Sequence, residues 1–190
     1  MAAETGCDKV SGAEVVRRLE RHPAMKARIA RLLDLVENTD GDLKLADEAE
    51  QRAIDELRAM GQELLHGWGQ RLADEEAHGL VRQGNLVYQV KKLDWHGTFG
   101  EIEVTEQIYR GKSDGILRRP FAAVAGICCR GYSRPLQRVI TDFGADVSFG
   151  RVGEKLKEHY GIAVPLGSAA TITYKHAHAL DDEDVVPPIQ

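Results

Sequence analysis

The chain has 190 residues, of which 43% are hydrophobic, so it can build one or two small domains with buried cores and is not a disordered chain. No run of about 18 apolar residues occurs, and the N-terminus lacks an apolar signal core. We therefore expect no membrane span, no membrane partner and no secretion, and a cytoplasmic location. The three cysteines, two of them adjacent, fit a reducing compartment.

Charge is unevenly distributed along the chain, whose formal net charge is −5. Residues 1–80 carry 11 Lys and Arg against 17 Asp and Glu, whereas residues 81–180 carry 14 against 9. The first part is therefore acidic, and the second part has a modest positive balance that permits contact with the phosphates of nucleic acid.

Residues 1–80 are predicted to form an N-terminal helical region. Ser11 and Glu14 have the spacing of a capping box, which predicts a short helix to about Arg21. A second helix is predicted after His22-Pro23 and ends at about Glu37. Its apolar stripe predicts that five side chains point inward: Met25, Ile29, Leu32, Leu33 and Val36.

A long amphipathic helix is predicted from Asp47 to His78, because apolar residues recur there at steps of three and four. Gly61, Gly67 and Gly69 weaken the helix locally, so we expect it to bend or to end early near Trp68. A helix this long and one-sided needs a partner. Its apolar line consists of Ile54, Leu57, Met60, Leu64, Leu65, Trp68 and Leu72.

Residues 81–130 are predicted to form a β-hairpin and a connecting loop, because the apolar period changes from 3.6 to 2 after Gly84. A switch of parity at Lys91-Lys92 predicts a β-bulge in the first strand. The segment from Gly97 to Gly100 predicts the turn, and a third strand is expected near residues 119–122. Two strands alone are marginal, so the hairpin must pack on a helix or on another domain. The second strand buries Ile102, Val104 and Ile108, with Glu101, Glu103, Thr105 and Gln107 on its opposite face.

Residues 131–180 are predicted to form a three-helix, helix-turn-helix-like bundle. Gly161 suits the left-handed position that ends a helix, and Pro165 suits a helix start, so the chain must turn between them. Three apolar stripes face the shared core: Leu136, Val139, Ile140 and Phe143; Phe149, Val152, Leu156 and Tyr160; and Leu166, Ala169, Ile172, His176 and Leu180.

The last of these helices has the outward face that a recognition helix needs, with small residues near its start and hydroxyl and ammonium donors further on. An ordinary helical hairpin with a solvated outer face has the same pattern, because a helix-turn-helix differs only in its crossing angle. The predicted DNA-binding residues are Ser168, Thr171, Tyr174, Lys175, Lys155, Lys157, Arg134 and Arg138.

Several longer stretches resemble a known family. They read KKLDWHGTFGEIEV at 91–104, RGYSRPLQR at 130–138, LKEHYGI at 156–162 and ITYKH at 172–176, with AEQR at 49–52 as a further similarity. Over roughly residues 45–180 the chain resembles the N-terminal part of the Kra-type insertion-sequence transposases, which are DDE transposases. The resemblance implies binding to transposon-end DNA during transposition. In that family a DDE-type catalytic domain with two divalent metal ions follows this region.

The C-terminal ten residues differ from that family, which would continue toward its first catalytic aspartate after about Leu180. Four consecutive acids, residues 181–184, begin the last segment instead. We therefore expect a chain truncated before the catalytic domain, with residues 181–190 as a disordered acidic tail. Asp142 and Asp146 lie one helical turn apart, and capping or solvent exposure explains them better than metal binding.

The sequence thus predicts an α+β protein made of N-terminal helices with one long amphipathic helix, a β-hairpin and a C-terminal helix-turn-helix bundle. We expect no catalytic residue, no metal site and no cofactor in this chain, since divalent metal is implied only for the missing catalytic domain. The expected partners are double-stranded DNA of transposon ends and a second copy of the chain or a full-length transposase. The alternative function is a helical protein-interaction module without DNA binding.

Overall fold

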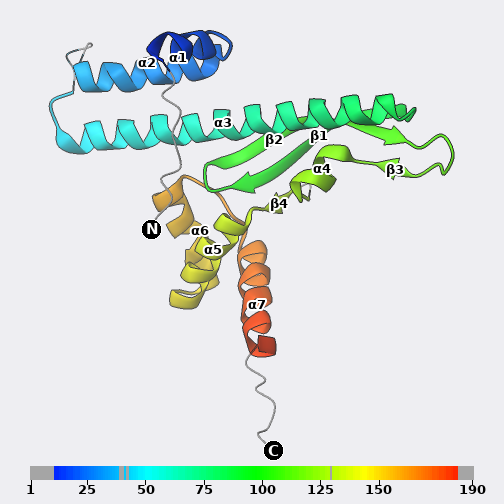
Figure 1. Ribbon diagram of the computed structural model, residues 1–190. Coiled ribbons are helices and arrows are strands. Elements are labelled where there is room, and N and C mark those ends of the chain that lie inside the picture. Colours follow the sequence, from blue (N-terminus) through cyan, green and yellow to red (C-terminus); the bar gives the residue numbers. More distant parts are fainter. Residues whose placement is uncertain (1–10, 39–40, 42, 129, 184–190) are drawn as a thin grey trace, which may run out of the picture. The chain divides into compact units, whose positions relative to one another are not determined.

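The computed structural model describes residues 11–38, 41, 43–128 and 130–183, with side chains up to residue 179. These residues form an α+β protein with seven helices and one four-stranded sheet (Figure 1). The chain divides into two compact units, Met1–Leu64 and Leu65–Gln190, which we describe one at a time. The division falls inside the long helix, whereas the sequence placed a boundary near residue 80.

The first unit begins with the two short helices that the sequence predicts, α1 (Gly12–Glu20) and α2 (Pro23–Glu37). Ser11 caps α1 by accepting a hydrogen bond from the N–H of Glu14 at 3.2 Å. Pro23 is the first residue of α2, where its missing N–H costs no helical hydrogen bond. Local sequence signals therefore determine both helix starts.

The described apolar residues of the first unit are half-buried or exposed, and Met25, Ile29 and Leu32 of the predicted stripe are half-buried. No described residue of α1 or α2 is buried, and Leu33 and Val36 are 52% and 82% exposed. The prediction that these two side chains point inward is therefore wrong. Ion pairs join α2 to the next helix instead, because Arg28 Nη1 lies 3.1 Å and Arg31 Nη1 lies 3.4 Å from the carboxylate of Glu56.

The long helix α3 (Ala46–Arg82) runs for 37 residues. It continues past Trp68 to Arg82, so the predicted early end is wrong. In the second unit, a Cβ on Gly69 would lie 2.6 Å from Val104 Cγ2 and 3.3 Å from Phe121 Cζ. Gly69 is therefore a point of close approach between α3 and the sheet, where a side chain would not fit without a shift.

The sheet has the strand order β3-β2-β1-β4. Its centre is an antiparallel hairpin of β1 (Leu86–Gly97) and β2 (Gly100–Arg110), as the sequence predicts. The short strand β3 (Leu117–Arg118) pairs antiparallel with β2, and β4 (Gly131–Tyr132) pairs parallel with β1.

The bulge in β1 lies nearer the start of the strand than the sequence predicts. The register shifts between Val87 and Gln89, whereas Lys91 and Lys92 pair regularly with β2. The change of parity in the sequence has another cause: the first part of β1 buries neither face, and burial begins at Leu93. Four apolar side chains in the first half of the strand are therefore exposed: Leu86, Val87, Tyr88 and Val90.

The third strand is also shifted along the chain. Residues 119–122, where it was expected, lie at the start of helix α4 (Pro120–Ala125), and Arg119 is the residue that precedes this helix. A proline at the first helical position favours a helix over a strand there. The strand itself is Leu117–Arg118.

Helix α3 packs against the hairpin, which confirms the prediction that the hairpin packs on a helix or on another domain (Figure 1). Two of its side chains also bond to the backbone of β2. His66 Nδ1 donates to the carbonyl of Glu103 at 2.6 Å, while the Gln70 amide accepts from Thr105 N–H and donates to its carbonyl. Glu103 and Thr105 pair with β1 on one side, and β3 pairs with β2 only at Tyr109 and Arg110, so these bonds occupy β2 backbone that β3 does not reach. The buried cluster beneath consists of Ala73, Leu93, Trp95, Ile102, Val104 and Phe121.

Glu106 is a fully buried carboxylate on the inner face of β2, in line with the apolar residues of that face. Its Oε1 accepts from the N–H of Ala122 at 3.0 Å and its Oε2 from Arg119 Nε at 3.0 Å. Ala122 lies in the first turn of α4, so the side chain of Glu106 in β2 caps the N-terminus of this helix. The buried charge is thus paired, and it fixes α4 on the sheet.

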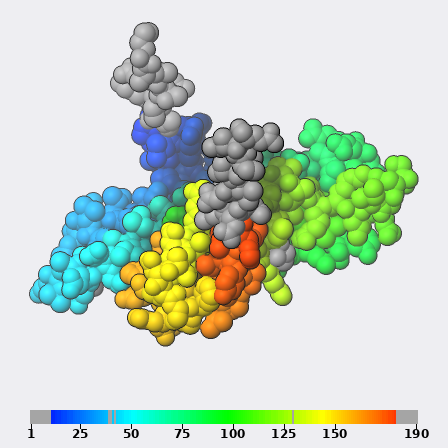
Figure 2. All heavy atoms as spheres, turned by 90° about the horizontal axis from the view of Figure 1, so that it is seen from below, coloured from blue at the N-terminus to red at the C-terminus, as the bar shows by residue number. Residues whose placement is uncertain are grey.

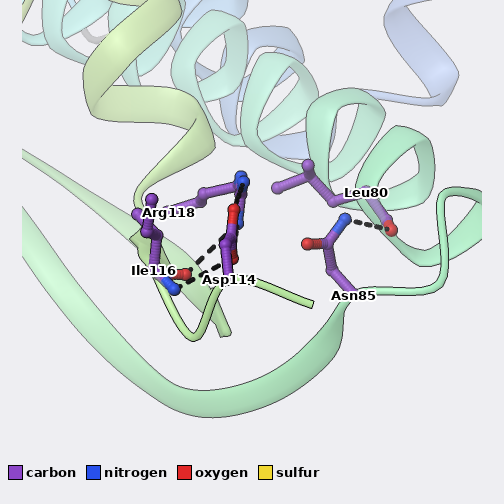
Figure 3. Close-up of polar contacts among 5 residues, drawn as sticks. All are labelled: Leu80, Asn85, Asp114, Ile116 and Arg118. Carbon is purple, nitrogen blue, oxygen red and sulfur yellow. Dashed lines mark hydrogen bonds and ion pairs between the residues drawn. The ribbon is translucent and has the colours of Figure 1, made fainter. Parts of the chain in front are cut away.

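The loop between β2 and β3 is held by one aspartate. Asp114 accepts hydrogen bonds from the N–H of Ile116 at 3.0 Å and from Arg118, whose Nη2 lies 2.5 Å from Asp114 Oδ2 (Figure 3). These interactions hold the pKa of Asp114 at about 2, mainly through the hydrogen bond with Arg118. At the end of α3, Asn85 Nδ2 donates to the carbonyl of Leu80 at 3.1 Å.

Three consecutive helices complete the second unit: α5 (Arg134–Asp146), α6 (Phe149–Tyr160) and α7 (Leu166–Glu183). Figure 2 shows them together, in yellow to red. Helix α7 includes the first three residues of the predicted acidic tail, and residues 184–190 lie outside the described residues.

In the described part of the chain, no helix combines the length and the apolar content that crossing a membrane requires.

Candidate nucleic-acid interface

The three C-terminal helices share one buried core. Leu136 and Ile140 of α5, Val152 and Leu156 of α6, and Ala169 of α7 are each 0% exposed. These residues belong to the stripes that the sequence predicts. Leu166 departs from its stripe, because it is 60% exposed at the first turn of α7, and the side chain of Leu180 lies outside the described ones. His176 is half-buried.

The connection between α6 and α7 is a tight turn built on Gly161. Its φ of 68° is left-handed, and its N–H donates to the carbonyl of Lys157 at 3.0 Å, while Ile162 N–H donates to that of Leu156 at 3.3 Å. The bond from Gly161 N–H to the Lys157 carbonyl is the one that defines the αL type of helix end. Ile162 and Val164 are 5% and 7% exposed, so the turn is packed into the core. The predicted turn between α6 and α7 is confirmed. Its hydrogen bonds and buried side chains restrain the angle between the two helices.

Glycine also determines how closely α5 and α7 cross. Gly144 of α5 faces Thr173 of α7, and a Cβ on this glycine would overlap the Thr173 side chain. The Thr173 hydroxyl donates to the carbonyl of Ala169 at 3.0 Å, so its polar atom is satisfied inside α7. Any side chain larger than hydrogen at Gly144 would therefore push the two helices apart.

The outward face of α7 carries four of the predicted DNA-binding residues. Thr171, Tyr174 and Lys175 are exposed, and Ser168 is half-buried. The Thr171 hydroxyl donates to the carbonyl of Gly167 at 2.8 Å, which leaves its oxygen free to accept. The Tyr174 ring meets the Phe149 ring edge-on at 5.4 Å between centroids. Helix α7 carries no Asp or Glu from Leu166 to Ala179, so this face has no negative charge.

Arg134 and Arg138 lie one turn apart on α5, and both are exposed. The same exposed side of α5 continues through Asp142 and Asp146, which are also exposed. The first half of this face is therefore basic and the second half acidic. An anion would meet favourable charge only along the first half, next to the start of the helix.

Lys155 and Lys157 do not form one cluster. Two residues on a helix are about 200° apart around its axis, so the two side chains leave α6 in different directions. Lys157 is exposed, whereas Lys155 is half-buried and its Nζ lies 5.4 Å from the centre of the Phe143 ring. Lys155 therefore packs on the bundle through a cation–π contact, which makes it less available to a phosphate than Lys157.

A pocket of about 690 Å³ lies beside the bundle, and no pattern in the sequence predicts it. Its walls come from α3, the turn of the hairpin, the segment after α4 and the start of α5. Only Arg134 links this pocket to the predicted site. The aromatic lining consists of Trp68, Trp95, Phe99 and Tyr132. No local signal could have found it, because its walls are far apart in the chain.

Comparisons with protein-family models and with curated proteins find no match for this chain.

Proposed function

We propose that the chain binds double-stranded DNA through the outward face of α7, as the end-recognition part of a transposase of the Kra-type insertion-sequence class. The observation that carries the proposal is the composition of that face. From Leu166 to Ala179 it has no carboxylate, small residues at its start and the donors of Thr171 and Lys175 further along. A helix with this face meets the requirements for entering a major groove.

The arrangement before α7 supports the proposal. A preceding helix, a glycine-led turn and a following helix occur in that order, with the turn residues Ile162 and Val164 buried in the bundle. This is the sequence of elements in a helix-turn-helix, in which the second helix reads the groove. Arg134 and Arg138 on α5 would add phosphate contacts that position the bundle without reading bases.

Duplex affinity measured against salt concentration tests the proposal. We expect the wild-type chain to bind with a non-specific dissociation constant on the order of 1–100 µM, and to bind more weakly as salt rises. Lys175→Glu should weaken binding to all sequences, because it replaces an ammonium on the α7 face with a carboxylate. The loss of the Lys175 charge should also reduce the dependence of log affinity on log salt by roughly one unit.

Lys112→Glu is the matched control, because Lys112 is an exposed lysine in the loop between β2 and β3. The change in net charge is the same in the two variants. If Lys112→Glu weakens binding as much as Lys175→Glu does, affinity depends on overall charge and α7 is not the contact surface. If the wild-type chain binds no duplex even at low salt, the proposal is wrong.

Self-association is a second candidate function, and it rests on the first unit. The helices α1 and α2 have no buried residue among those described, and Val16, Leu33 and Val36 are 56%, 52% and 82% exposed. Exposed apolar surface of this kind is typical of an interface. Light scattering of the full chain tests it: we expect a dimer that Leu33→Asp dissociates. A monomer at all accessible concentrations would contradict this second function.

A further inference from the structure

The pocket beside the bundle is built from segments that meet at the turn of the hairpin. Its volume of about 690 Å³ lies within the range of sites that enclose small organic molecules. Two of its aromatic residues, Trp68 and Phe99, are 39% and 41% exposed, so their rings are accessible. Trp95 is 5% exposed and packs at 6.0 Å from the Phe121 ring, which fixes the inner wall.

Backbone hydrogen bonds hold the walls of this pocket in place. The N–H of Arg130 donates to the carbonyl of Asp94 at 2.6 Å, and that of Ser133 donates to the carbonyl of His96 at 2.8 Å. A Cβ on Gly131 would lie 2.7 Å from the carbonyl oxygen of Cys128, so the segment after α4 folds back tightly there. The pocket is therefore largely formed before any ligand arrives.

The chemistry of the lining selects the class of ligand. None of the described lining residues is an aspartate or a glutamate, and the one fully charged side chain among them is the guanidinium of Arg134. A cation would find no counter-charge here. A flat, aromatic ligand that carries an anionic group would stack on the rings and pair with Arg134.

The position of the pocket adds a constraint. Arg134 lines its wall, and Arg138 is exposed one turn further along α5, so a phosphate chain that follows these two arginines leads to the pocket. A nucleotide has both features that the lining requires, a planar base and a phosphate.

We propose that this pocket takes a single unstacked nucleotide of the DNA that the bundle binds, with the base between Trp68 and Phe99 and its phosphate near Arg134. The inference rests on the proposed function, because it names the part of the DNA that this second site receives. An unpaired or frayed nucleotide enters the pocket at a lower cost in free energy than a paired nucleotide, because a paired one must first be unpaired and unstacked.

The test uses the full chain and DNA that carries the fluorescent base 2-aminopurine. One duplex has a single unpaired 2-aminopurine overhang, and the other has the same base paired inside a blunt duplex of matched length. We expect the overhang duplex to bind on the order of 10-fold more tightly, because stacking one base on aromatic side chains adds a binding free energy of about this size. Stacking should also quench the fluorescence of the overhanging base.

Phe99→Ala is the diagnostic variant, and Tyr88→Ala is its control. Tyr88 is an exposed aromatic residue on the same hairpin, at 50% exposure, and does not line the pocket. Phe99→Ala should abolish the preference and the quenching while leaving affinity for the blunt duplex unchanged, and Tyr88→Ala should change neither. Arg134→Gln provides a second variant, because the turn that holds Phe99 stays intact in it; it should reduce the preference.

The outcomes separate this inference from the proposed function. Binding of both duplexes with equal affinity, or quenching that persists in Phe99→Ala, overturns the nucleotide pocket and leaves duplex binding by α7 standing. If neither duplex binds, a single-stranded 2-aminopurine oligonucleotide decides the matter. Quenching of that oligonucleotide that depends on Phe99 supports the pocket alone, and its absence overturns both proposals.

Discussion

The structure predicts a specific loss of stability when Glu106 is replaced. Its carboxylate is fully buried, and it accepts from the N–H of Ala122 and from Arg119 Nε, each at 3.0 Å. Glu106→Ala would leave the N–H of Ala122 without an acceptor, which costs about 1–3 kcal/mol in a buried position. Arg119 is 38% exposed and can turn to water, so the loss of its ion pair adds only about 0–1 kcal/mol.

We therefore expect Glu106→Ala to lower the free energy of unfolding of the second unit by about 1–4 kcal/mol. Glu106→Gln keeps one acceptor oxygen for Ala122 but loses the charge and the acceptor for Arg119 Nε, which can turn to water, so it should lose less, about 1 kcal/mol. The effect extends to the candidate site, because the segment that follows α4 forms one wall of the pocket.

Urea unfolding followed by tryptophan fluorescence measures this effect. The chain has two tryptophans, Trp68 and Trp95, and each lies about 6 Å from Phe121 at the start of α4. Glu103→Gln is the control, since Glu103 lies on the exposed face of the same strand and pairs with Lys92 at 2.8 Å. A surface pair of this kind contributes about 0–1 kcal/mol. The reasoning is refuted if Glu106→Ala loses no more stability than Glu103→Gln.

Three further predictions concern the bundle and the hairpin. Gly144→Ala should lower the melting temperature of the chain, because the added Cβ would overlap the Thr173 side chain. Gly150→Ala is the control and should not lower it, because a Cβ there has no neighbour within 4 Å; equal melting temperatures for the two variants would contradict the close crossing of α5 and α7. Asp142→Asn combined with Asp146→Asn should tighten DNA binding at low salt by removing negative charge beside the α5 arginines, and unchanged gel-shift affinity would argue against contact along α5. Asp114 should titrate at about pH 2 by NMR, because Arg118 stabilises its charged form. Since its pKa is lowered on folding, its contribution to stability is complete above about pH 3.8 and is lost as the pH falls through about 2; a midpoint near 3.8 would show that the pair does not form in solution.

Local chemistry in the sequence was sufficient to predict most of the elements. Ser11, Pro23 and Gly161 each act on the backbone within a few residues of themselves, and the helix ends that they predict are present. The alternation of apolar residues predicted the inner face of β2, and the stripes of α5 and α6 predicted the core of the bundle. The helix ends and the alternation in β2 depend on near neighbours in the chain, and the stripes of α5 and α6 become a core because short connections bring these helices together.

The errors have a common cause in contacts between distant residues. Gly69 looked like a weak point of a helix, and the structure shows it against Val104 and Phe121 on the sheet. Lys155 looked like a free surface charge, and it lies over the Phe143 ring. The stripe in α2 looked like a core, yet no described residue of that helix is buried, because a periodic apolar pattern does not say which element covers it.

The candidate site divides along the same line. The sequence alone determined the acid-free face of α7 and the glycine turn before it, because both are properties of consecutive residues. Only the tertiary structure decided that Glu106 caps α4 and that Arg134 lines a pocket with Trp68 and Phe99. It also decided that Lys155 packs on the Phe143 ring, whereas Lys157 is exposed to solvent. These pairings join residues up to 66 positions apart, and only the packing of the folded chain brings such residues together.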